Sequence, residues 1–397
     1  MTNQAQPTGT PVSGPVPLLA QAFAALDDAG IDWALLRGAD ELADPQGDVD
    51  VLAGVPDLRR ADEALAAVGW LRLAAPGRGS HRFWFGYDER ADRWLKLDVV
   101  TRVEVGAWHE LRLPLGPDLL ARRWHDGSVW RLAGHDEQWL RLLHEVCDKG
   151  RPGLPWVEGL TTRGPVPAAF DAVVGAGAAE RLLDQLAPPR RTPAAAAEAA
   201  RARLVRRLKS GRRWPLGRGR IVQVLGPDGA GKTTLVGALV EQLPVDAAPV
   251  YMGLWRQSAT ERRLAPLPGG TTATRVVRMA RKVLWVRWHA ARGRLVVLDR
   301  SAYDALLADA DRSAGGRVLA WLALRWSPEP FLVVLLDAPG QVLFGRKPEH
   351  PVEVLEQRRQ DYLAQHPGAL VLDASRPADE VRRAALAGMW TRLAQLS

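Results

Sequence analysis

One short glycine-rich stretch, VLGPDGAGKTTLV at residues 224–236, constrains the fold more than any other part of the chain. It contains the pattern G-x-x-x-x-G-K-[ST], with Gly226, Gly231, Lys232 and Thr233 at the defining positions. An apolar strand pattern precedes it, and apolar residues at helical spacing follow it. Glycines at such positions let backbone N–H groups converge on phosphate oxygens without a Cβ in the way. The stretch therefore predicts a strand, a loop and a helix that together bind a nucleoside triphosphate.

The residues of this loop have separate roles in the predicted site. The helix that begins near Gly231 directs its positive dipole end at the phosphates. Lys232 supplies a charge to the β- and γ-phosphates, and the Thr233 hydroxyl can ligate Mg²⁺. The predicted nucleotide-binding residues are Gly226, Gly229, Gly231, Lys232, Thr233 and Thr234. ATPases, GTPases and small-molecule kinases all carry such a loop, so the loop alone does not decide among them.

Composition and apolar patterning divide the chain into four parts. Residues 220–397 alternate apolar strands, such as RLVVLDR, FLVVLLDAP and ALVLDAS, with amphipathic helices. This alternation predicts an α/β P-loop domain with a parallel sheet and helices on both faces. Residues 16–188 predict an α+β domain that opens with a helix, PLLAQAFAALDDAG, and a strand, IDWALLRG. Residues 189–219 predict a basic helical linker, and residues 1–15 a disordered tail.

Three segments of the C-terminal domain resemble signatures of the thymidylate kinase-like family. They are GPDGAGKTT, VVLDRSAYD and FGRKPEHPVEVLEQRRQDYL, which follow the family's order between Arg220 and the C-terminus. The resemblance implies ATP and Mg²⁺ as cofactors. It also implies phosphoryl transfer to a small-molecule acceptor that already carries a phosphate.

The same resemblance implies catalytic roles for individual residues. Asp228 is implied to face the acceptor, where an acid can accept a hydrogen bond from a substrate hydroxyl. Asp299 and Arg300 end a strand at the carboxyl edge of the sheet, where the first is implied to position Mg²⁺ and the second to clamp a phosphate. A lid that begins at Arg346 and Lys347 is implied to close over the γ-phosphate. The predicted catalytic residues are Lys232, Asp299, Arg300, Arg346, Lys347 and Asp228.

Further residues near these motifs allow more than one interpretation. Tyr303 and Asp304 either shape the acceptor pocket or pack in the core. Arg358 and Arg359 are expected on a solvated edge of the lid helix rather than in catalysis. The basic segment 275–294 either flanks an anionic acceptor or packs as an amphipathic helix.

The sequence departs from the family pattern at two places, and these departures leave the identity of the phosphate acceptor open. Ser301 stands where the family usually has an aromatic residue, and residues 254–293 lack an obvious base-reading pattern. The expected acceptor is therefore a nucleoside monophosphate of the dTMP kind or a related small phosphorylated metabolite.

Three aspartates in the N-terminal domain suggest a metal site. Asp48 and Asp50 lie two residues apart in a strand-like segment, so their carboxylates share one face, and Asp98 lies in a second such segment, RWLKLDVV. Three carboxylates on strands can hold two Mg²⁺ ions that activate a hydroxyl and stabilise pyrophosphate. The arrangement resembles the nucleotidyltransferase fold, although Gly38 and Ala39 stand where that family has Gly-Ser or Gly-Gly. Three interpretations remain open: an active metal-dependent nucleotidyltransferase, a degenerate relic of that fold, and an unrelated structure.

Five histidines have no spacing typical of metal ligands and are expected to be structural: His81, His109, His125, His135 and His144.

The charge of the chain does not by itself decide which partner the protein binds. The formal net charge is +8, and residues 190–220 contain eleven basic residues against one acid, Glu198. Such a segment predicts a solvated connecting helix, with contact to nucleic acid or a membrane less favoured.

The single Cys147 excludes an intrachain disulfide and fits a reducing compartment. The N-terminus lacks a secretory pattern and no segment reaches the roughly 18 apolar residues that span a bilayer, so a soluble cytoplasmic protein is expected.

Three classes of function therefore compete. The first is a small-molecule kinase with an appended nucleotidyltransferase-like domain, as a monomer or a homodimer. The second is a nucleotidyltransferase that the P-loop half supports. The third is a nucleotide-switched protein that binds nucleic acid through residues 190–220. The lid segment favours the first class, because a switch protein does not need a kinase lid.

Overall fold

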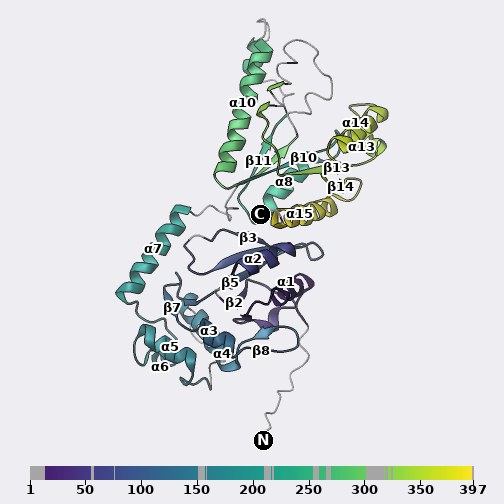
Figure 1. The fold of residues 1–397 in the computed structure, drawn as a ribbon. Helices are drawn as coiled ribbons and strands as arrows, with labels where there is room; N and C mark the ends of the chain where they lie inside the picture. The colour runs from purple at the N-terminus through teal and green to yellow at the C-terminus, as the bar shows by residue number, and fades with distance from the viewer. Residues whose placement is uncertain are drawn as a thin grey trace. The chain divides into compact units, whose positions relative to one another are not determined.

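A computed structural model describes most of the chain, which folds as two compact units (Figure 1). Unit 1 contains residues 1–88, 93–210 and 394–397, and unit 2 contains residues 89–92 and 211–393. The described residues are 14–54, 58–75, 77–150, 157, 159–209, 216, 219–253, 259–264, 270–300, 317, 321–322 and 325–395. The predicted tail lies outside this set except for its last two residues, Gly14 and Pro15.

Unit 1 is built on a seven-stranded mixed sheet with the strand order β3-β4-β5-β2-β1-β9-β8. β2 and β5 are parallel neighbours, while β4 pairs antiparallel with β5 and β1 antiparallel with β2. The strands are β1 (Trp33–Leu35), β2 (Val49–Ala53), β3 (Leu71–Leu73), β4 (Arg82–Asp88), β5 (Arg93–Val100), β8 (Trp124–His125) and β9 (Trp130–Arg131), with a separate pair β6 (Val103–Val105) and β7 (Leu111–Leu113).

Alternation along the central strands gives this sheet two apolar faces. On β2, Val49 and Val51 pack in a core with the first two helices, whereas Leu52 packs in a second core with the later helices. Because side chains alternate along a strand, Asp50 shares the face of Leu52, and Asp98 on β5 likewise shares the face of Val100. The helices are α1 (Pro17–Asp28), α2 (Leu58–Ala67), α3 (Gly116–Ala121), α4 (Gly134–Leu143), α5 (Pro165–Val174), α6 (Ala178–Gln185) and α7 (Pro193–Lys209), with short helices η1 (Ala39–Glu41) and η3 (His144–Asp148).

Unit 2 contains a five-stranded sheet with the order β11-β12-β10-β13-β14, and every neighbouring pair is parallel. The predicted parallel sheet flanked by helices is thereby confirmed. The strands are β10 (Arg220–Leu225), β11 (Ala247–Tyr251), β12 (Leu295–Asp299), β13 (Leu332–Asp337) and β14 (Leu370–Asp373). The helices are α8 (Lys232–Gln242), α9 (Ala259–Leu264), α10 (Gly270–Ala291), α13 (Gly340–Arg346), α14 (Val352–Gln365) and α15 (Ala378–Gln395).

The core of unit 2 explains why its central strands are almost wholly apolar. All five residues of β12 are buried, as expected for a parallel strand covered on both faces. Val296 and Leu298 pack against Met279, Val283 and Val286 of α10. Among the described helices, none combines the length and apolarity needed to cross a bilayer.

Candidate functional site

The loop between β10 and α8 has a backbone that only glycine accommodates at several positions. Gly226, Gly229 and Gly231 have φ angles of 144°, 87° and 91°. A Cβ on Gly226 would lie 2.6 Å from the carbonyl oxygen of Leu336, and one on Gly229 would lie 2.8 Å from that of Leu343. The loop is therefore fixed both by its positive φ angles and by the close approach of neighbouring backbone.

Lys232 is the first residue of α8 and is buried, with 6% of its surface exposed. Its Nζ donates to the carbonyl oxygens of Gly226 and Pro227, at 2.6 and 2.7 Å. A buried ammonium needs such partners because its desolvation is costly. These hydrogen bonds hold the charge over the loop at the carboxyl end of β10, where the glycines open the backbone.

Thr233 and Asp299 form the second feature of the site. The Thr233 Oγ1 donates to the Asp299 Oδ2 at 2.7 Å, and Asp299 lies beside Val224 in the parallel register of β10 and β12. Asp299 is 4% exposed, and its Oδ1 is buried without a hydrogen-bond partner. A hydroxyl and a carboxylate with a spare oxygen, next to a phosphate loop, are ligands that suit Mg²⁺ when a nucleotide supplies the others. The residues present therefore fit the expected ion.

Asp228, at the centre of the loop, is surrounded by cations. Its Oδ1 accepts from Arg300 Nη2 at 2.8 Å, its Oδ2 accepts from Arg358 Nη1 at 3.4 Å, and the Oδ2 lies 3.9 Å from His350 Nε2. Lys232 Nζ lies 4.0 Å from the same carboxylate. Burial by itself would raise the pKa of Asp228, but the charges of Lys232 and Arg300 outweigh it and hold that pKa below its usual value. Asp228 is thus an ionised carboxylate within a cationic cluster.

The predicted lid residues are placed differently from one another. Arg346 ends α13, and its Nη1 donates to the carbonyl oxygen of Ala374, just after β14, at 2.7 Å. Lys347 pairs with Glu349 at 2.8 Å, and its charge contributes to lowering the pKa of Asp228. Arg346 therefore lies at the carboxyl end of an outer strand, outside the group of cations bonded to Asp228.

Two arginines of α14, which were predicted to be solvated, bond to carboxylates instead. Arg358 reaches Asp228, so it belongs to the site. Arg359 instead bonds Asp337 at the end of β13, at 2.5 and 3.1 Å, and Glu356 on its own helix at 2.6 Å. The expectation of a solvated pair was wrong for both, because each side chain finds a carboxylate on another part of the fold that the helical pattern does not reveal.

Part of the predicted acceptor region lies outside the described residues. This holds for Ser301, Tyr303 and Asp304, and for residues 254–258 and 265–269 of the segment without a base-reading pattern. Residues 275–294 are described by the structure. They pack as the amphipathic helix that was one of the two expectations, since Met279, Val283 and Val286 of α10 are buried against the sheet.

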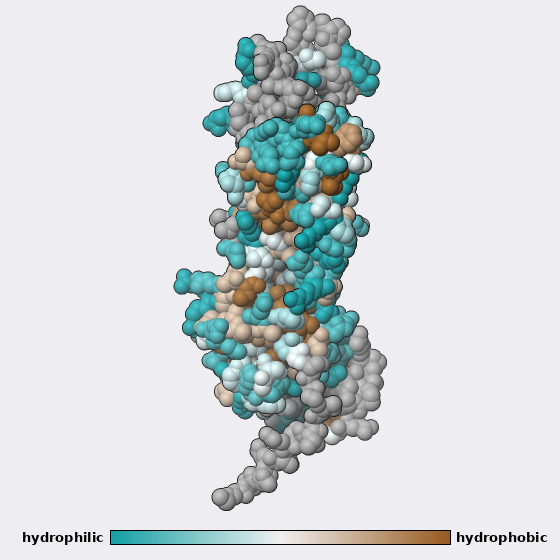
Figure 2. Space-filling model, turned by 90° about the vertical axis from the view of Figure 1, so that its right-hand side faces the viewer, coloured by the Kyte–Doolittle hydropathy of each residue, from teal (hydrophilic) through white to brown (hydrophobic). Residues whose placement is uncertain are grey.

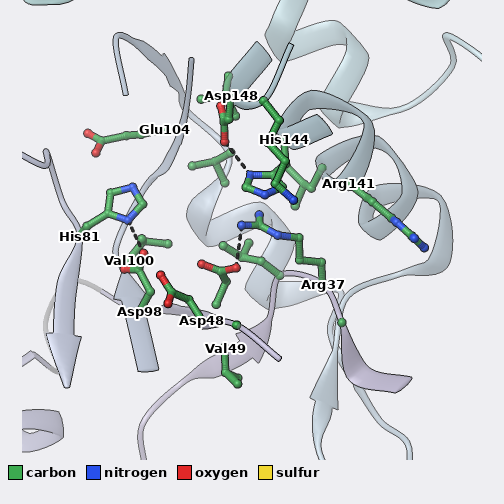
Figure 3. A pocket seen from close by; sticks show the side chains of 18 of the residues that line it. Arg37, Asp48, Val49, His81, Asp98, Val100, Glu104, Arg141, His144 and Asp148 are labelled. Atoms are coloured by element: carbon green, nitrogen blue, oxygen red, sulfur yellow. Dashed lines mark hydrogen bonds and ion pairs between the residues drawn. The ribbon is translucent and has the colours of Figure 1, made fainter. Parts of the chain in front are cut away.

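Unit 1 contains a separate cavity of about 610 Å³ (Figure 3). Asp50 and Asp98 are register neighbours on the parallel strands β2 and β5, and both line it together with Asp48. Each of these carboxylates has a cationic or imidazole partner: Asp50 bonds Arg37 at 2.6 Å, Asp98 bonds His81 at 2.7 Å, and Asp48 bonds Lys96. Burial raises the pKa of Asp50 despite the neighbouring Arg37.

The structure brings two of the three predicted acids into direct register but does not gather a ligand cluster. No group of three or more His, Cys, Asp or Glu side chains that could hold a metal occurs among the described residues. Five residues that line the cavity have a buried side-chain atom without a hydrogen-bond partner: the Asp98 Oδ1, the His81 Nε2, the Glu104 Oε1, the His109 Nδ1 and the Arg206 Nη2. The spare Asp98 oxygen is compatible with a further ligand at this wall.

Three histidines expected to be structural line this cavity. The rings of His81 and His109 lie 4.0 Å apart between centroids, and His144 bonds Asp148 at 2.7 Å. Burial, followed by the positive charges nearby, lowers the pKa of His109 to about 3, so it is neutral at physiological pH. Sequence spacing missed these residues because the segments that carry them are far apart along the chain: His81 precedes β4, His109 lies between β6 and β7, and His144 begins η3.

The segment predicted as a connecting helix contributes to unit 1. Arg191 bonds Glu110 at 2.6 Å, and on α7 Arg206 donates to the carbonyl oxygen of Gly77 at 3.0 Å. Glu198, the one acid of the segment, bonds Arg112 at 2.6 Å. Several of the charges counted for the linker are therefore bound within the unit itself.

Comparisons with known proteins give similarity over part of the chain. No family model matches it. It is 34% identical over 148 residues to the hemin import ATP-binding protein HmuV of Pseudomonas entomophila (strain L48), which covers 32% of this chain and 56% of that protein. The HmuV protein of Pseudomonas aeruginosa gives 34% identity over 143 residues, with the same two shares. The chain thus spans about half the length of these curated relatives. Their similarity agrees with a P-loop domain, but neither relative is named as a kinase, so the thymidylate kinase-like resemblance is not confirmed.

Proposed function

We propose that unit 2 binds ATP with Mg²⁺ and transfers the γ-phosphoryl group to a small acceptor that already carries a phosphate. ATP as the nucleotide is supported by the glycine loop with its buried Lys232 and by the partial similarity to proteins named as ATP-binding. Lys232, now bonded to loop carbonyls, would turn to the β- and γ-phosphates when these replace its partners.

Mg²⁺ would be held by Thr233 and Asp299. The two side chains already touch, and the spare Oδ1 of Asp299 is buried. When bound, the ion would supply charge neutralisation on the β- and γ-phosphate oxygens. The carboxylate and hydroxyl of the protein would fix its position at the carboxyl edge of β10 and β12.

The cationic cluster around Asp228 is the observation that carries the proposal. Arg300, Arg358 and Lys232 converge on one carboxylate beside the phosphate loop. Phosphoryl transfer is catalysed chiefly by positioning and by neutralising the charge on the migrating group. The guanidinium groups come from two different places in the fold, Arg300 directly after β12 and Arg358 on α14, and can bind donor and acceptor phosphates from two sides.

The state of Asp228 favours a phosphate over a neutral hydroxyl as the attacking group. Its pKa lies below the usual value, and it is bonded to cations, so it is a poor proton acceptor. A phosphate oxygen is already anionic near neutral pH and needs no strong base. It forms the new bond to the γ-phosphorus while the bond from that phosphorus to the bridging oxygen breaks, and ADP leaves with the electron pair.

The resemblance to thymidylate kinases places a nucleoside monophosphate such as dTMP first among such acceptors. Another small phosphorylated metabolite is the alternative within the same chemistry. The lid residues Arg346 and Lys347 belong to this proposal as groups that a movement of α13 and α14 would bring to the nucleotide.

The test is transfer of label from γ-labelled ATP to a panel of nucleoside monophosphates and sugar phosphates, with product separation. The expected result is one labelled diphosphate or pyrophosphate ester, lost on replacement of Asp299 by Asn. Asp361→Asn is the matched control, because Asp361 is a carboxylate of the same unit whose partner is the exposed Gln357 on α14. ATP binding with release of inorganic phosphate alone, whatever the acceptor, would rule out the kinase and leave an ATPase.

A second function is proposed for unit 1, a Mg²⁺-dependent nucleotidyltransferase. It rests on Asp50 and Asp98, which neighbour each other in register and line one cavity with Asp48. Transfer of α-labelled nucleotide with release of pyrophosphate would support it. The double variant Asp48→Asn/Asp50→Asn should abolish that transfer, whereas Lys232→Met should leave it unchanged. Equal transfer by both variants would refute the assignment.

A further inference from the structure

The helix α10 presents an apolar stripe on the side opposite to its core face. Met279, Val283 and Val286 are buried against β11 and β12. On the other side the exposed fractions are 59% for Val277, 64% for Leu284, 53% for Trp285 and 45% for Trp288. Positions 277, 284 and 288 fall on one line of a helix with 3.6 residues per turn, and position 285 lies beside it.

The aromatic part of this stripe is ordered by its own contacts. The rings of Trp285 and Trp288 stack at 4.9 Å between centroids with an interplanar angle of 16°. The Arg292 guanidinium lies 4.9 Å from the Trp288 ring centroid, and His289 packs edge-on against both indoles. The two indoles therefore form one flat exposed surface rather than two independent side chains.

The charge on α10 has a single sign. The helix contains no Asp or Glu, and its basic residues are Arg275, Arg278, Arg281, Lys282 and Arg287. Arg292 and Arg294 follow it, and the second of these pairs with Asp246 at 2.7 Å. Lys282 turns toward the sheet, where its Nζ donates to the carbonyl oxygen of Gly253 at 2.7 Å. Arg281 and Arg287 are exposed and lie on opposite flanks of the apolar line.

We propose that this face of α10 docks unit 2 on the surface of an anionic lipid bilayer. An apolar stripe flanked by arginines, with tryptophans at its edge, suits the boundary between acyl chains and head groups. The arginines would meet lipid phosphates while Val277, Leu284 and Trp288 enter the apolar layer. The helix would lie on the membrane, which agrees with its being unable to cross it.

Two other occupants fit this face less well. A second copy of the chain would bring two wholly basic helices together, with repulsion between like charges. Nucleic acid would be attracted by the arginines, but Val277 and Leu284 in the centre of the stripe would gain nothing from a phosphate backbone. The side of unit 2 drawn in Figure 2 differs, since its exposed apolar residues form small separate groups among polar ones.

The test is co-sedimentation of the full chain with vesicles of phosphatidylcholine alone or mixed with phosphatidylglycerol. We expect salt-sensitive binding to the anionic vesicles only. Leu284→Gln/Trp288→Gln and Arg281→Gln/Arg287→Gln should each weaken it by about tenfold or more, since both the buried apolar area and the charges contribute. All four side chains are exposed, so circular dichroism should show the variants folded. Trp124→Gln, at an exposed tryptophan of unit 1, should bind like the wild type.

Three results would overturn the proposal. One is equal binding by the wild type and both double variants. A second is binding of single-stranded or duplex DNA that Arg281→Gln/Arg287→Gln removes and Leu284→Gln/Trp288→Gln does not, in the absence of vesicle binding. A third is a dimer in sedimentation velocity that dissociates in Leu284→Gln/Trp288→Gln, which would assign the face to a second copy. None of these outcomes depends on phosphoryl transfer.

Discussion

At the scale of single residues, the aspartate inside the phosphate loop is best understood as a counter-ion. An acid beside bound phosphates would repel them unless cations outnumber it. Asp228 is in contact with Arg300 and Arg358 and lies near Lys232, so positive groups exceed it in number. The carboxylate keeps the arginines at the loop, and a substrate phosphate can then share them.

This role predicts opposite effects of Asp228→Asn on two measured quantities. Without the carboxylate, Arg300 and Arg358 lose the group that positions them, and kcat should fall by about 100-fold, as for misplaced catalytic groups elsewhere. The dissociation constant of ATP should stay equal or decrease, because a negative charge near the phosphates is gone. Calorimetric titration and steady-state assays give the two numbers. Asp361→Asn on α14, whose carboxylate accepts from Gln357, is the control, and weaker ATP binding would contradict the counter-ion role.

His109 gives a prediction for unit 1 that depends on pH. Its folded pKa is lowered to about 3, first by burial and then by His81, Arg206, Arg78 and His144. The unfolded chain binds a proton below the ordinary value near 6.5, whereas the folded chain does not until far lower pH. This histidine therefore makes folding less favourable as pH falls through that window.

Replacing His109 by Asn should remove this component of acid sensitivity. Asn tolerates the left-handed backbone that His109 adopts, with φ of 57°. We expect the fall in Tm between about pH 7 and about pH 4 to be smaller in the variant than in the wild type. Thermal melts across that range measure it, with His125→Asn, at an exposed position, as control. An unchanged pH dependence would show that His109 is protonated in the folded state.

Sequence spacing predicts best those residues that are neighbours in the chain. Gly226, Lys232 and Thr233 lie where the motif places them, between β10 and α8, and their role in nucleotide binding stays a prediction. Arg358 and His81 were missed because their partners lie 130 and 17 residues away, and only the fold brings them together. A pattern along one helix or strand carries no information about such partners.

At the scale of elements, the strands that were predicted are those with continuous apolar runs. β10, β12 and β13 have such runs because neighbouring strands and helices bury most of their residues. β14 has an apolar run as well, but it is an edge strand in which only Leu372 is buried. β11 was not predicted, since burial alternates along it and Pro249 interrupts it. It is an edge strand, where proline is tolerated because one side of the backbone needs no partner.

The adjacent arginines of α14 provide an experiment within one element. Arg358→Ala should lower kcat by about 100-fold, since a cation at the site is lost, with little change in Tm. Arg359→Ala should do the reverse, because Arg359 ties α14 to Asp337 on β13. Loss of hydrogen bonds to a partly buried charged group costs about 1.5–3 kcal/mol. Kinetics and thermal melts on both variants check this, and a loss of kcat in Arg359→Ala equal to that in Arg358→Ala would contradict it.

At the scale of the whole molecule, each unit closes its own hydrophobic core. Unit 1 buries tryptophans and leucines on both faces of its mixed sheet, and unit 2 buries the residues between its parallel sheet and its helices. The sequence predicted two folded regions from composition, and the boundary between the units falls between residues 210 and 211, within the segment predicted as a linker. The contribution of α7 to unit 1 could not be predicted, because its partners, such as Gly77, lie far away along the chain.

Separate cores predict that Mg²⁺ with ATP stabilises one unit selectively. A ligand that binds only the folded state at 100 times its dissociation constant adds about 2.7 kcal/mol, which for a domain of this size raises Tm by about 5–10 °C. Calorimetry of the full chain should show one transition that moves by this amount and one that does not. Lys232→Met should abolish the shift without displacing the other transition, because Lys232 lies within unit 2 alone. A shift that persists in Lys232→Met and disappears in Asp48→Asn/Asp50→Asn would assign the nucleotide to the cavity of unit 1 instead, and with it the principal activity of the chain.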